Sequence, residues 1–324
     1  MVNRSEIKEA IAAFKHRARI VDISDISGQN RETYEVELSS GEKLICCFNK
    51  NRPEWFKLEE SLIGIVDEET DVPTQNILYS DLTGEVNSQI FHIAEKIEGS
   101  KSEEEYAELP LDQKEEIVRQ IGRYLAEIHD NIKFENFGRF RYENEGLDIE
   151  KYEWVELVQE IAEEYIDSME NTRFEDLQGE FRDYVQKNLH LLDESNPVLV
   201  HYDVAVDNVI REGTDIKAIL DWERAFIGRP EWDLAYSEVR FILQFLDDEE
   251  DVNQLKQTFY QSYRKVNSLD EGWRKRIEYY RMIQLFHGME YFENWTDRKN
   301  YSEIEKKQEE KWHRKHFRKN NIEL

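Results

Sequence analysis

Hydrophobic residues follow two different spacings, one before about residue 100 and one after it. In the first part they form short runs rich in β-branched and aromatic residues, which predict strands. Ser39, Ser40 and Gly41 separate two of these runs and indicate a β-hairpin. The expected strands are residues 18–27, 33–38, 43–48, 72–79 and 89–97, and the expected helices are 4–17 and 55–66.

Beyond that point the hydrophobic positions have the spacing of helices. Ile117, Ile121, Leu125 and Ile128 form one stripe, which predicts a helix over 114–130. A β-rich interruption follows later, with a hairpin expected around Gly213. The other expected helices are 152–169, 177–193, 232–247, 252–266 and 272–294, and the interruption comprises 198–200, 209–211 and 218–220.

Together these spacings predict a two-lobed α+β fold. We expect a small antiparallel sheet lobe at residues 1–98 and a larger, mainly helical lobe at residues 99–324. The chain has 324 residues, with 16 Phe, 16 Tyr and 7 Trp, and can bury a sizeable core. Such an aromatic composition excludes an intrinsically disordered chain.

The charge of the chain is strongly negative. Its 71 acidic and 43 basic residues give a formal net charge of −28. A surface of this sign repels phosphate backbones, which argues against nucleic acid as a partner. It attracts metal ions, polyamines and amino sugars. Adaptation to a salty cytoplasm explains the same charge, and the two explanations are compatible.

Cys46 and Cys47 are the only cysteines of the sequence. Neighbours on a strand point to opposite faces, so these two are poorly placed to pair, and no disulfide framework is expected. Residues 1–15 contain acidic residues and no long apolar core, and no run reaches the length of a membrane span. The sequence therefore predicts a cytoplasmic protein without a membrane partner.

Candidate chemistry is concentrated between residues 201 and 235. His201-Tyr202-Asp203 is followed by Asn208, and a second apolar strand ends in Asp221. Phosphoryl transfer needs oxygen ligands that hold Mg²⁺ against the phosphates and a carboxylate that accepts the proton of the attacking hydroxyl. The hairpin between Asn208 and Asp221 would bring these two residues close together, and Asp203 could face the acceptor.

This pattern resembles the aminoglycoside phosphotransferase and choline kinase group, whose fold is protein-kinase-like. The resemblance rests on H-x-D-x-x-x-x-N at 201–208, on the strand ending in Asp221, and on Gly-x-Pro and Asp-Leu-Ala at 228–235. It implies an ATP- or GTP-dependent transfer to a hydroxyl of a small molecule, with Asp203 as the base. Asn208 and Asp221 would then hold Mg²⁺. The alternative is that these residues only form turns and helix caps.

Further residues fit the same resemblance. A Gly- and Asn-containing turn would hold phosphate oxygens, a helical glutamate would pair with the ATP-orienting lysine, and a connecting strand would bind adenine through its backbone. In this chain these roles fall on Gly28, Gln29 and Asn30, on Glu59, and on Ala94, Glu95 and Lys96. His201 is expected to anchor its loop by hydrogen bonds, Asp233 to brace that loop or cap a helix, and His129 to be a packing residue.

The chain departs from the group at the ATP-orienting lysine. Cys47 or Phe48 stands where the lysine is expected, and Lys43 and Lys50 flank this strand. A catalytically degenerate nucleotide-binding protein is therefore an alternative, as is a structural protein that uses its acidic surface. The acceptor stays open among amino sugars, choline-like alcohols, thioribose sugars and amino-acid hydroxyls. Two acids of a late helix, Glu290 and Glu293, could contact a cationic acceptor.

Overall fold

The chain forms two compact units, shown in a computed structural model that describes residues 2–27, 31–48, 53–86, 88–143, 146–192 and 195–321. The first unit comprises 1–117, 140–149 and 206–225, and the second comprises 118–139, 150–205 and 226–324. The first unit therefore contains all of the predicted sheet lobe, 1–98, and in addition residues 99–117, residues 140–149 and the hairpin around Gly213, which were expected in the helical lobe. In the described part of the chain, no helix has the length and hydropathy needed to cross a membrane.

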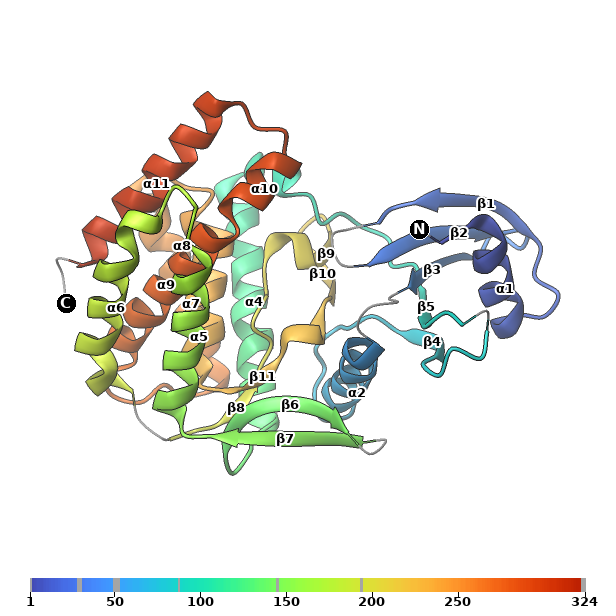
Figure 1. Ribbon diagram of the computed structural model, residues 1–324, viewed down its shortest axis with the longest axis horizontal. Coiled ribbons are helices and arrows are strands. Elements are labelled where there is room, and N and C mark those ends of the chain that lie inside the picture. Colours follow the sequence, from blue (N-terminus) through green and yellow to red (C-terminus); the bar gives the residue numbers. More distant parts are fainter. Residues whose placement is uncertain are drawn as a thin grey trace. The chain divides into compact units, whose positions relative to one another are not determined.

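A five-stranded antiparallel sheet is the centre of the first unit. Its strand order is β1-β2-β3-β5-β4, and Figure 1 shows these strands side by side. The strands are β1 (Ile20–Asp25), β2 (Glu32–Leu38), β3 (Lys43–Phe48), β4 (Ile77–Asp81) and β5 (Phe91–Glu95). The antiparallel sheet expected from the sequence is thus confirmed.

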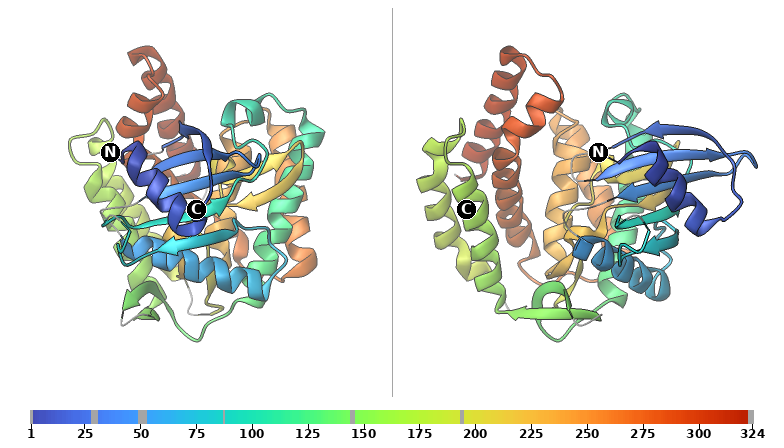
Figure 2. Two further views of the ribbon diagram at one scale, coloured as in Figure 1. Left: turned by 90° about the vertical axis from the view of Figure 1, so that its right-hand side faces the viewer. Right: turned by 45° about the vertical axis from the view of Figure 1, so that its right-hand side comes forward.

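The two faces of this sheet pack against different helices. One face carries Tyr34, Cys46 and Phe48 and packs against α1 (Arg4–Phe14), which lies across the sheet in Figure 2. On the other face Ile45 and Cys47 pack against Phe56 of α2 (Pro53–Glu69). Cys46 and Cys47 therefore point to opposite faces, and both are free thiols, as expected.

A second, smaller hairpin completes the first unit. It consists of β9 (Val209–Glu212) and β10 (Asp215–Ile219), which pair in antiparallel register. Ser100, just before the helix α3 (Glu103–Ala107), exchanges backbone hydrogen bonds with Arg211. Gly99 has φ +139, and a Cβ there would lie 2.6 Å from the Arg211 carbonyl oxygen, so this contact requires glycine.

The second unit is mainly helical. Its sheet pairs β11 with β8 and with the first residues of β6, and β6 forms a hairpin with β7. The helices are α4 (Leu111–Asn131), whose residues 111–117 belong to the first unit, α5 (Trp154–Ser168), α6 (Gln178–Asn188), α7 (Pro230–Glu238), α8 (Glu249–Val266), α9 (Trp273–Glu290), α10 (Phe292–Arg298) and α11 (Glu303–Asn321). The strands are β6 (Phe137–Glu143), β7 (Gly146–Tyr152), β8 (Val198–Val200) and β11 (Phe226–Gly228), and residues 140–149 of β6 and β7 are assigned to the first unit.

Aromatic side chains fill the core of the second unit. Trp154 stacks on Phe137 at a centroid distance of 4.9 Å, and its indole N–H donates to the Tyr280 hydroxyl at 2.8 Å. Trp232 of α7 packs edge-on to Trp154 at 6.1 Å. Every residue of α7 is buried, so this helix is held on all sides. It is a rigid support for the residues that contact it.

Several details differ from the sequence prediction, among them the following three. The hairpin of β6 and β7 was not expected, although Phe140 and Tyr142 alternate with arginines in its first strand. The strand expected at 72–79 begins only at Ile77, because Pro73 has no N–H to donate to a ladder. The helix expected at 272–294 is divided into α9 and α10 by a break at Tyr291.

Candidate active site

The loop after β8 is held in place by one buried carboxylate. The backbone N–H groups of His201 and Tyr202 donate to the two carboxylate oxygens of Asp233, both at 2.8 Å. Nε2 of His129 lies 3.2 Å from the same carboxylate, and its Nδ1 lies 3.0 Å from the Tyr263 hydroxyl. Asp233 thus braces the loop, as the sequence indicated. His129 is buried, as expected of a packing residue, but it also contacts Asp233 and Tyr263 through its ring nitrogens.

Asp203 follows in this loop with two defined contacts. Its backbone N–H donates to Nδ1 of His201 at 3.2 Å, so His201 anchors the loop as expected. Its Oδ1 accepts a hydrogen bond from the Tyr236 hydroxyl of α7. Tyr202 between them has φ +80, a conformation that is rare for a bulky residue. Backbone strain of this kind is concentrated at functional sites.

In the first unit, the hairpin of β9 and β10 brings Asn208 and Asp221 together. The Leu220 N–H donates to the Asn208 carbonyl oxygen at 2.8 Å, so Asp221 follows directly after a residue bonded to Asn208. Asp221 has φ 69 and ψ 58, the left-handed conformation, and its side chain is 41% exposed. This carboxylate is therefore accessible from solvent.

Arg31 joins Asp221 to two buried glutamates, which sequence reasoning did not foresee. Its Nη1 donates to Oε2 of Glu59 at 2.6 Å, and its Nε donates to Oε2 of Glu223 at 3.1 Å. Nη2 also contacts Glu223, and it lies 3.4 Å from Oδ1 of Asp221. The guanidinium lies 5.0 Å from the centroid of the Phe56 ring. We call Arg31, Glu59, Asp221 and Glu223 the Arg31 cluster.

Burial and charge determine the protonation of this cluster. Burial raises the pKa of Glu59 to about 7, and the nearby Asp221 adds to this effect while Arg31 opposes it. Burial also raises the pKa of Glu223. For Arg31 burial acts against the charge, but the carboxylates outweigh it and raise its pKa above the usual value. The cluster has more acidic than basic groups and therefore has an affinity for a further cation.

The other site residues of the sequence prediction are placed as follows. Gly28, Gln29, Asn30 and Lys50 lie outside the described residues. Ala94 belongs to β5, which lies between β3 and the edge strand β4, and the N–H groups of Glu95 and Lys96 donate to the carbonyl oxygens of Asn76 and Lys43, at 3.0 and 3.3 Å. An adenine bound along this segment would therefore use carbonyl oxygens there, or amides from Ile97 onward. The adenine role of these residues stays a prediction.

Lys43 pairs with a residue outside the Arg31 cluster. Its ammonium lies 3.2 Å from Glu35, and Lys96 contacts the same glutamate at 3.0 Å. Of the acids considered for the acceptor, Glu293 accepts from Nε of Arg173 at 2.7 Å. Glu293 is thus already paired with an arginine of the helical unit.

The oxygen donors of Asn208 and Asp221 suit Mg²⁺. This ion prefers oxygen ligands and is commonly held by one or two side chains plus the substrate phosphates. Within the described residues, no group of three or more His, Cys, Asp or Glu side chains is arranged as a metal site. A magnesium ion here would thus depend on nucleotide phosphates for its remaining ligands.

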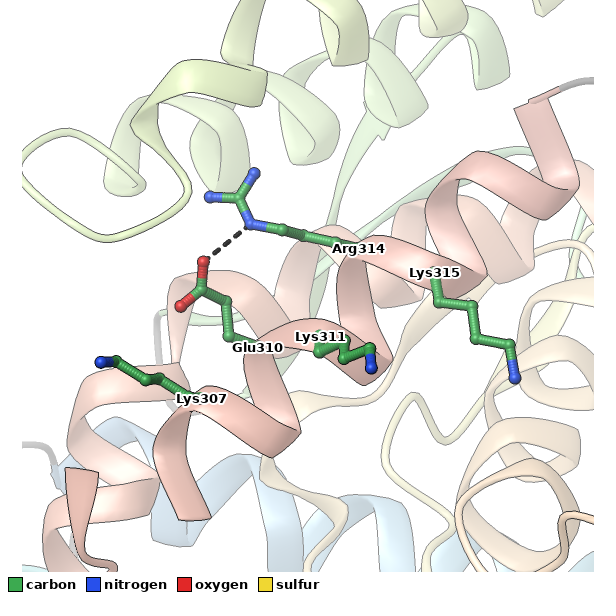
Figure 3. A pocket seen from close by; sticks show the side chains of 5 residues that line it. All are labelled: Lys307, Glu310, Lys311, Arg314 and Lys315. Atoms are coloured by element: carbon green, nitrogen blue, oxygen red, sulfur yellow. Dashed lines mark hydrogen bonds and ion pairs between the residues drawn. The ribbon is translucent and has the colours of Figure 1, made fainter. Parts of the chain in front are cut away.

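A separate hollow lies on α11, and it is not part of this chemistry. It measures about 470 Å³. Figure 3 shows Arg314 hydrogen-bonded to Glu310, at 2.8 Å, with Lys311 and Lys315 pointing away from this pair. Its lining residues are Lys307, Glu310, Lys311, Arg314 and Lys315. It contains none of the site residues predicted from the sequence.

Comparison with curated proteins finds distant similarity to a plant protein. The chain is 24% identical over 247 residues to a probable acyl-CoA dehydrogenase, IBR3, of Arabidopsis thaliana. The match covers 70% of this chain and 29% of that protein, so the chain spans less than a third of the relative's length.

Solved structures with the same fold are small-molecule kinases by name. Aminoglycoside phosphotransferase APH(4)-Ia superimposes with a TM-score of 0.67 at 15% identity, over 99% of both chains. The amicoumacin kinase hAmiN, in complex with AMP-PNP, Ca²⁺ and Ami, gives 0.68 at 14% identity, over 98% of this chain and 94% of that one. A putative fructosamine-3-kinase from Haemophilus somnus 129PT gives 0.64 at 14%, over 96% of both. The kinase-like α+β fold expected from the sequence is confirmed.

A family model identifies the chain more directly than these structural likenesses. The model is described as the phosphotransferase enzyme family, and it matches residues 22–271. This range includes Asp203, Asn208 and Asp221, on which the sequence resemblance rested. The chain therefore belongs to the phosphotransferase enzyme family.

Proposed function

We propose that this protein transfers the γ-phosphoryl group of ATP or GTP to a hydroxyl of a small molecule. The observation that carries the proposal is the position of Asp221. It is an accessible carboxylate in a strained backbone conformation. It lies next to Leu220, which is bonded to Asn208, and it shares Arg31 with the two buried acids of the Arg31 cluster. An oxygen-rich, negatively charged site of this kind suits a magnesium–nucleotide complex.

Asp203 is the proposed general base. It would accept the proton of the acceptor hydroxyl as that oxygen attacks the γ-phosphorus. Asp233 and Tyr236 support this role, because they hold the backbone of its loop and one of its carboxylate oxygens. A carboxylate that is held in one orientation is more often positioned to accept the proton.

Asn208 and Asp221 are the proposed ligands of Mg²⁺. When bound, the ion would neutralise charge on the phosphate oxygens during transfer. The chain itself contributes the amide oxygen of Asn208 and the carboxylate of Asp221. The complex of hAmiN with AMP-PNP and Ca²⁺ supports a nucleotide and a divalent cation in a protein of this fold.

The proposed acceptor is a cationic amino sugar or amino alcohol. The net charge of −28 favours the approach of cations. The names of the solved neighbours, aminoglycoside, amicoumacin and fructosamine kinases, support an acceptor that carries amino and hydroxyl groups. Because ATP and GTP are intracellular donors, the proposal includes a cytoplasmic location.

A panel of hydroxyl compounds tests the proposal. The protein is incubated with Mg²⁺ and with ATP or GTP labelled in the γ-phosphate, and the panel covers amino sugars, choline-like alcohols, thioribose sugars and hydroxyl amino acids. Enzyme-dependent label in one acceptor class supports the proposal. Binding of nucleotide without transfer to any member would favour a degenerate nucleotide-binding protein, an alternative that Cys47 at the lysine position keeps open. No binding of either nucleotide would overturn both.

A further inference from the structure

The strand position that lacks a lysine faces a cation from another strand. Cys47 lies on β3 and pairs across the sheet with Thr33 of β2. Paired residues of an antiparallel sheet point to the same face, and so does Arg31, which is two residues from Thr33. Arg31 is thus the diagonal neighbour of Cys47, at a typical Cα separation of about 7–8 Å.

The long arginine side chain bridges this distance. A lysine at position 47 would have to reach Glu59, which is the acid that accepts from Arg31 at 2.6 Å. The side chains of Glu59 and Glu223 are only 3% and 4% exposed, so each needs a cationic partner. Arg31 serves both, and its side chain is 14% exposed.

The contacts of Arg31 differ in length, and the longest of them lies on the side where a nucleotide phosphate is proposed to bind. Those to Glu59 and Glu223 are short, whereas Nη2 lies 3.4 Å from Asp221, the most exposed acid of the cluster. A guanidinium has five N–H donors in a rigid fork and can bind carboxylates and a phosphate at once. An arginine held by two buried acids therefore presents its outer edge beside Asp221, where the nucleotide phosphates are proposed to bind.

We propose that Arg31 replaces the missing strand lysine and orients the nucleotide phosphates from β2. It is a positioning residue, held by Glu59 and Glu223. The inference rests on the proposed nucleotide site and identifies one of its residues.

Moving the positive charge tests this inference. Affinities for AMP-PNP with Mg²⁺, and for adenosine, are measured by calorimetry for the wild type, Arg31→Ala and the double variant Arg31→Ala/Cys47→Lys. Removal of a charged hydrogen bond should weaken AMP-PNP binding about 10–100-fold. Adenosine affinity should change less than about threefold, because adenosine has no phosphate for Arg31 to contact. The double variant should recover at least about tenfold in AMP-PNP affinity.

Two controls keep the outcome unambiguous. Lys43→Ala removes another cation of the same sheet, one that pairs with Glu35, and should leave both affinities unchanged. Circular dichroism verifies folding, and Arg31→Gln, which is shorter and uncharged but keeps an N–H donor, replaces Arg31→Ala if the latter fails to fold.

Each contrary result has a defined meaning. Equal loss of AMP-PNP and adenosine affinity would show a structural role and overturn the inference. Unchanged or tighter AMP-PNP binding in Arg31→Ala would also overturn it. Absence of any recovery in the double variant would contradict the equivalence of the two positions. Failure of the wild type to bind either AMP-PNP or its guanine counterpart GMP-PNP would instead refute the proposed function.

Discussion

The Tyr236 hydroxyl donates a hydrogen bond to Oδ1 of Asp203. Tyr236 lies on α7 one turn after Asp233, whose carboxylate holds the backbone of His201 and Tyr202. One buried helix therefore fixes both the backbone of this loop and the side chain of the proposed base. The hydroxyl thereby fixes the orientation of one carboxylate oxygen of Asp203.

Asp221→Ala should weaken magnesium-dependent nucleotide binding together with turnover. We expect a loss of at least about tenfold in AMP-PNP affinity, because the variant removes an anionic oxygen ligand. Arg31 keeps Glu59 and Glu223 as partners, so the unit should still fold. A magnesium titration of nucleotide binding measures the effect, with Asp215→Ala as an exposed control on the same hairpin. An unchanged magnesium dependence would speak against the metal role.

Glu231→Ala should destabilise the second unit strongly. Glu231 is 1% exposed and accepts from Arg229 at 3.1 Å and from Arg276 at 2.8 Å. Its removal leaves two buried guanidinium groups short of charge compensation, which typically costs about 3–5 kcal/mol. Urea unfolding measures the loss. The exposed pair of Arg182 and Glu163 supplies a control, since Glu163→Ala should cost less than about 1 kcal/mol. Similar losses in both variants would contradict this account.

His92 should make folding sensitive to mild acid. It is 1% exposed, stacks on Phe56 at 4.4 Å, and neither ring nitrogen has a hydrogen-bond partner among the described residues. Burial, assisted by the charge of Arg31, lowers the pKa of His92 to about 3. Below a pH of about 6.5, His92 binds a proton in the unfolded chain but stays neutral in the native chain. The free energy of unfolding therefore falls as the pH falls.

A His92→Phe variant isolates this contribution. Between pH 6 and pH 4, its free energy of unfolding should fall less steeply than that of the wild type, by up to about 1.4 kcal/mol per pH unit. Urea unfolding at several pH values measures the two slopes. His190→Phe, at an exposed histidine, should leave the wild-type slope unchanged. Parallel curves for the wild type and His92→Phe would show that His92 takes up its proton in the folded state.

Sequence periodicity predicted most of the elements but not the contacts between distant segments. The alternation along β2 and the stripe on α4 record burial on one face, which a sequence displays directly. The cluster of Arg31 with Glu59 and Glu223 depends on the register of two strands and on where α2 packs. Local spacing reveals neither of them. Once the hairpin of β2 and β3 is assumed, however, Arg31 lies diagonal to Cys47, and this was a sequence signal for its role. The contact of Tyr236 with Asp203 was not predictable either. The sequence shows only that Tyr236 lies three residues after Asp233, on the same face of a helix.

The central claim is that Asp203 removes the proton from the acceptor in a phosphoryl transfer. Asp203→Asn keeps the shape of the side chain but cannot accept that proton, so turnover should fall by about 10²–10⁴. The affinity for AMP-PNP with Mg²⁺ should stay within about threefold of the wild type, because the base is not proposed to contact the nucleotide. Asp207→Asn, an exposed carboxylate in the same segment, is the matched control and should be near wild type in both measurements. The decisive measurement is therefore the transfer rate of Asp203→Asn at saturating nucleotide, with the acceptor identified in the panel. A loss of two orders of magnitude or more with intact nucleotide binding is the predicted result, and transfer within about twofold of the wild type would contradict the account.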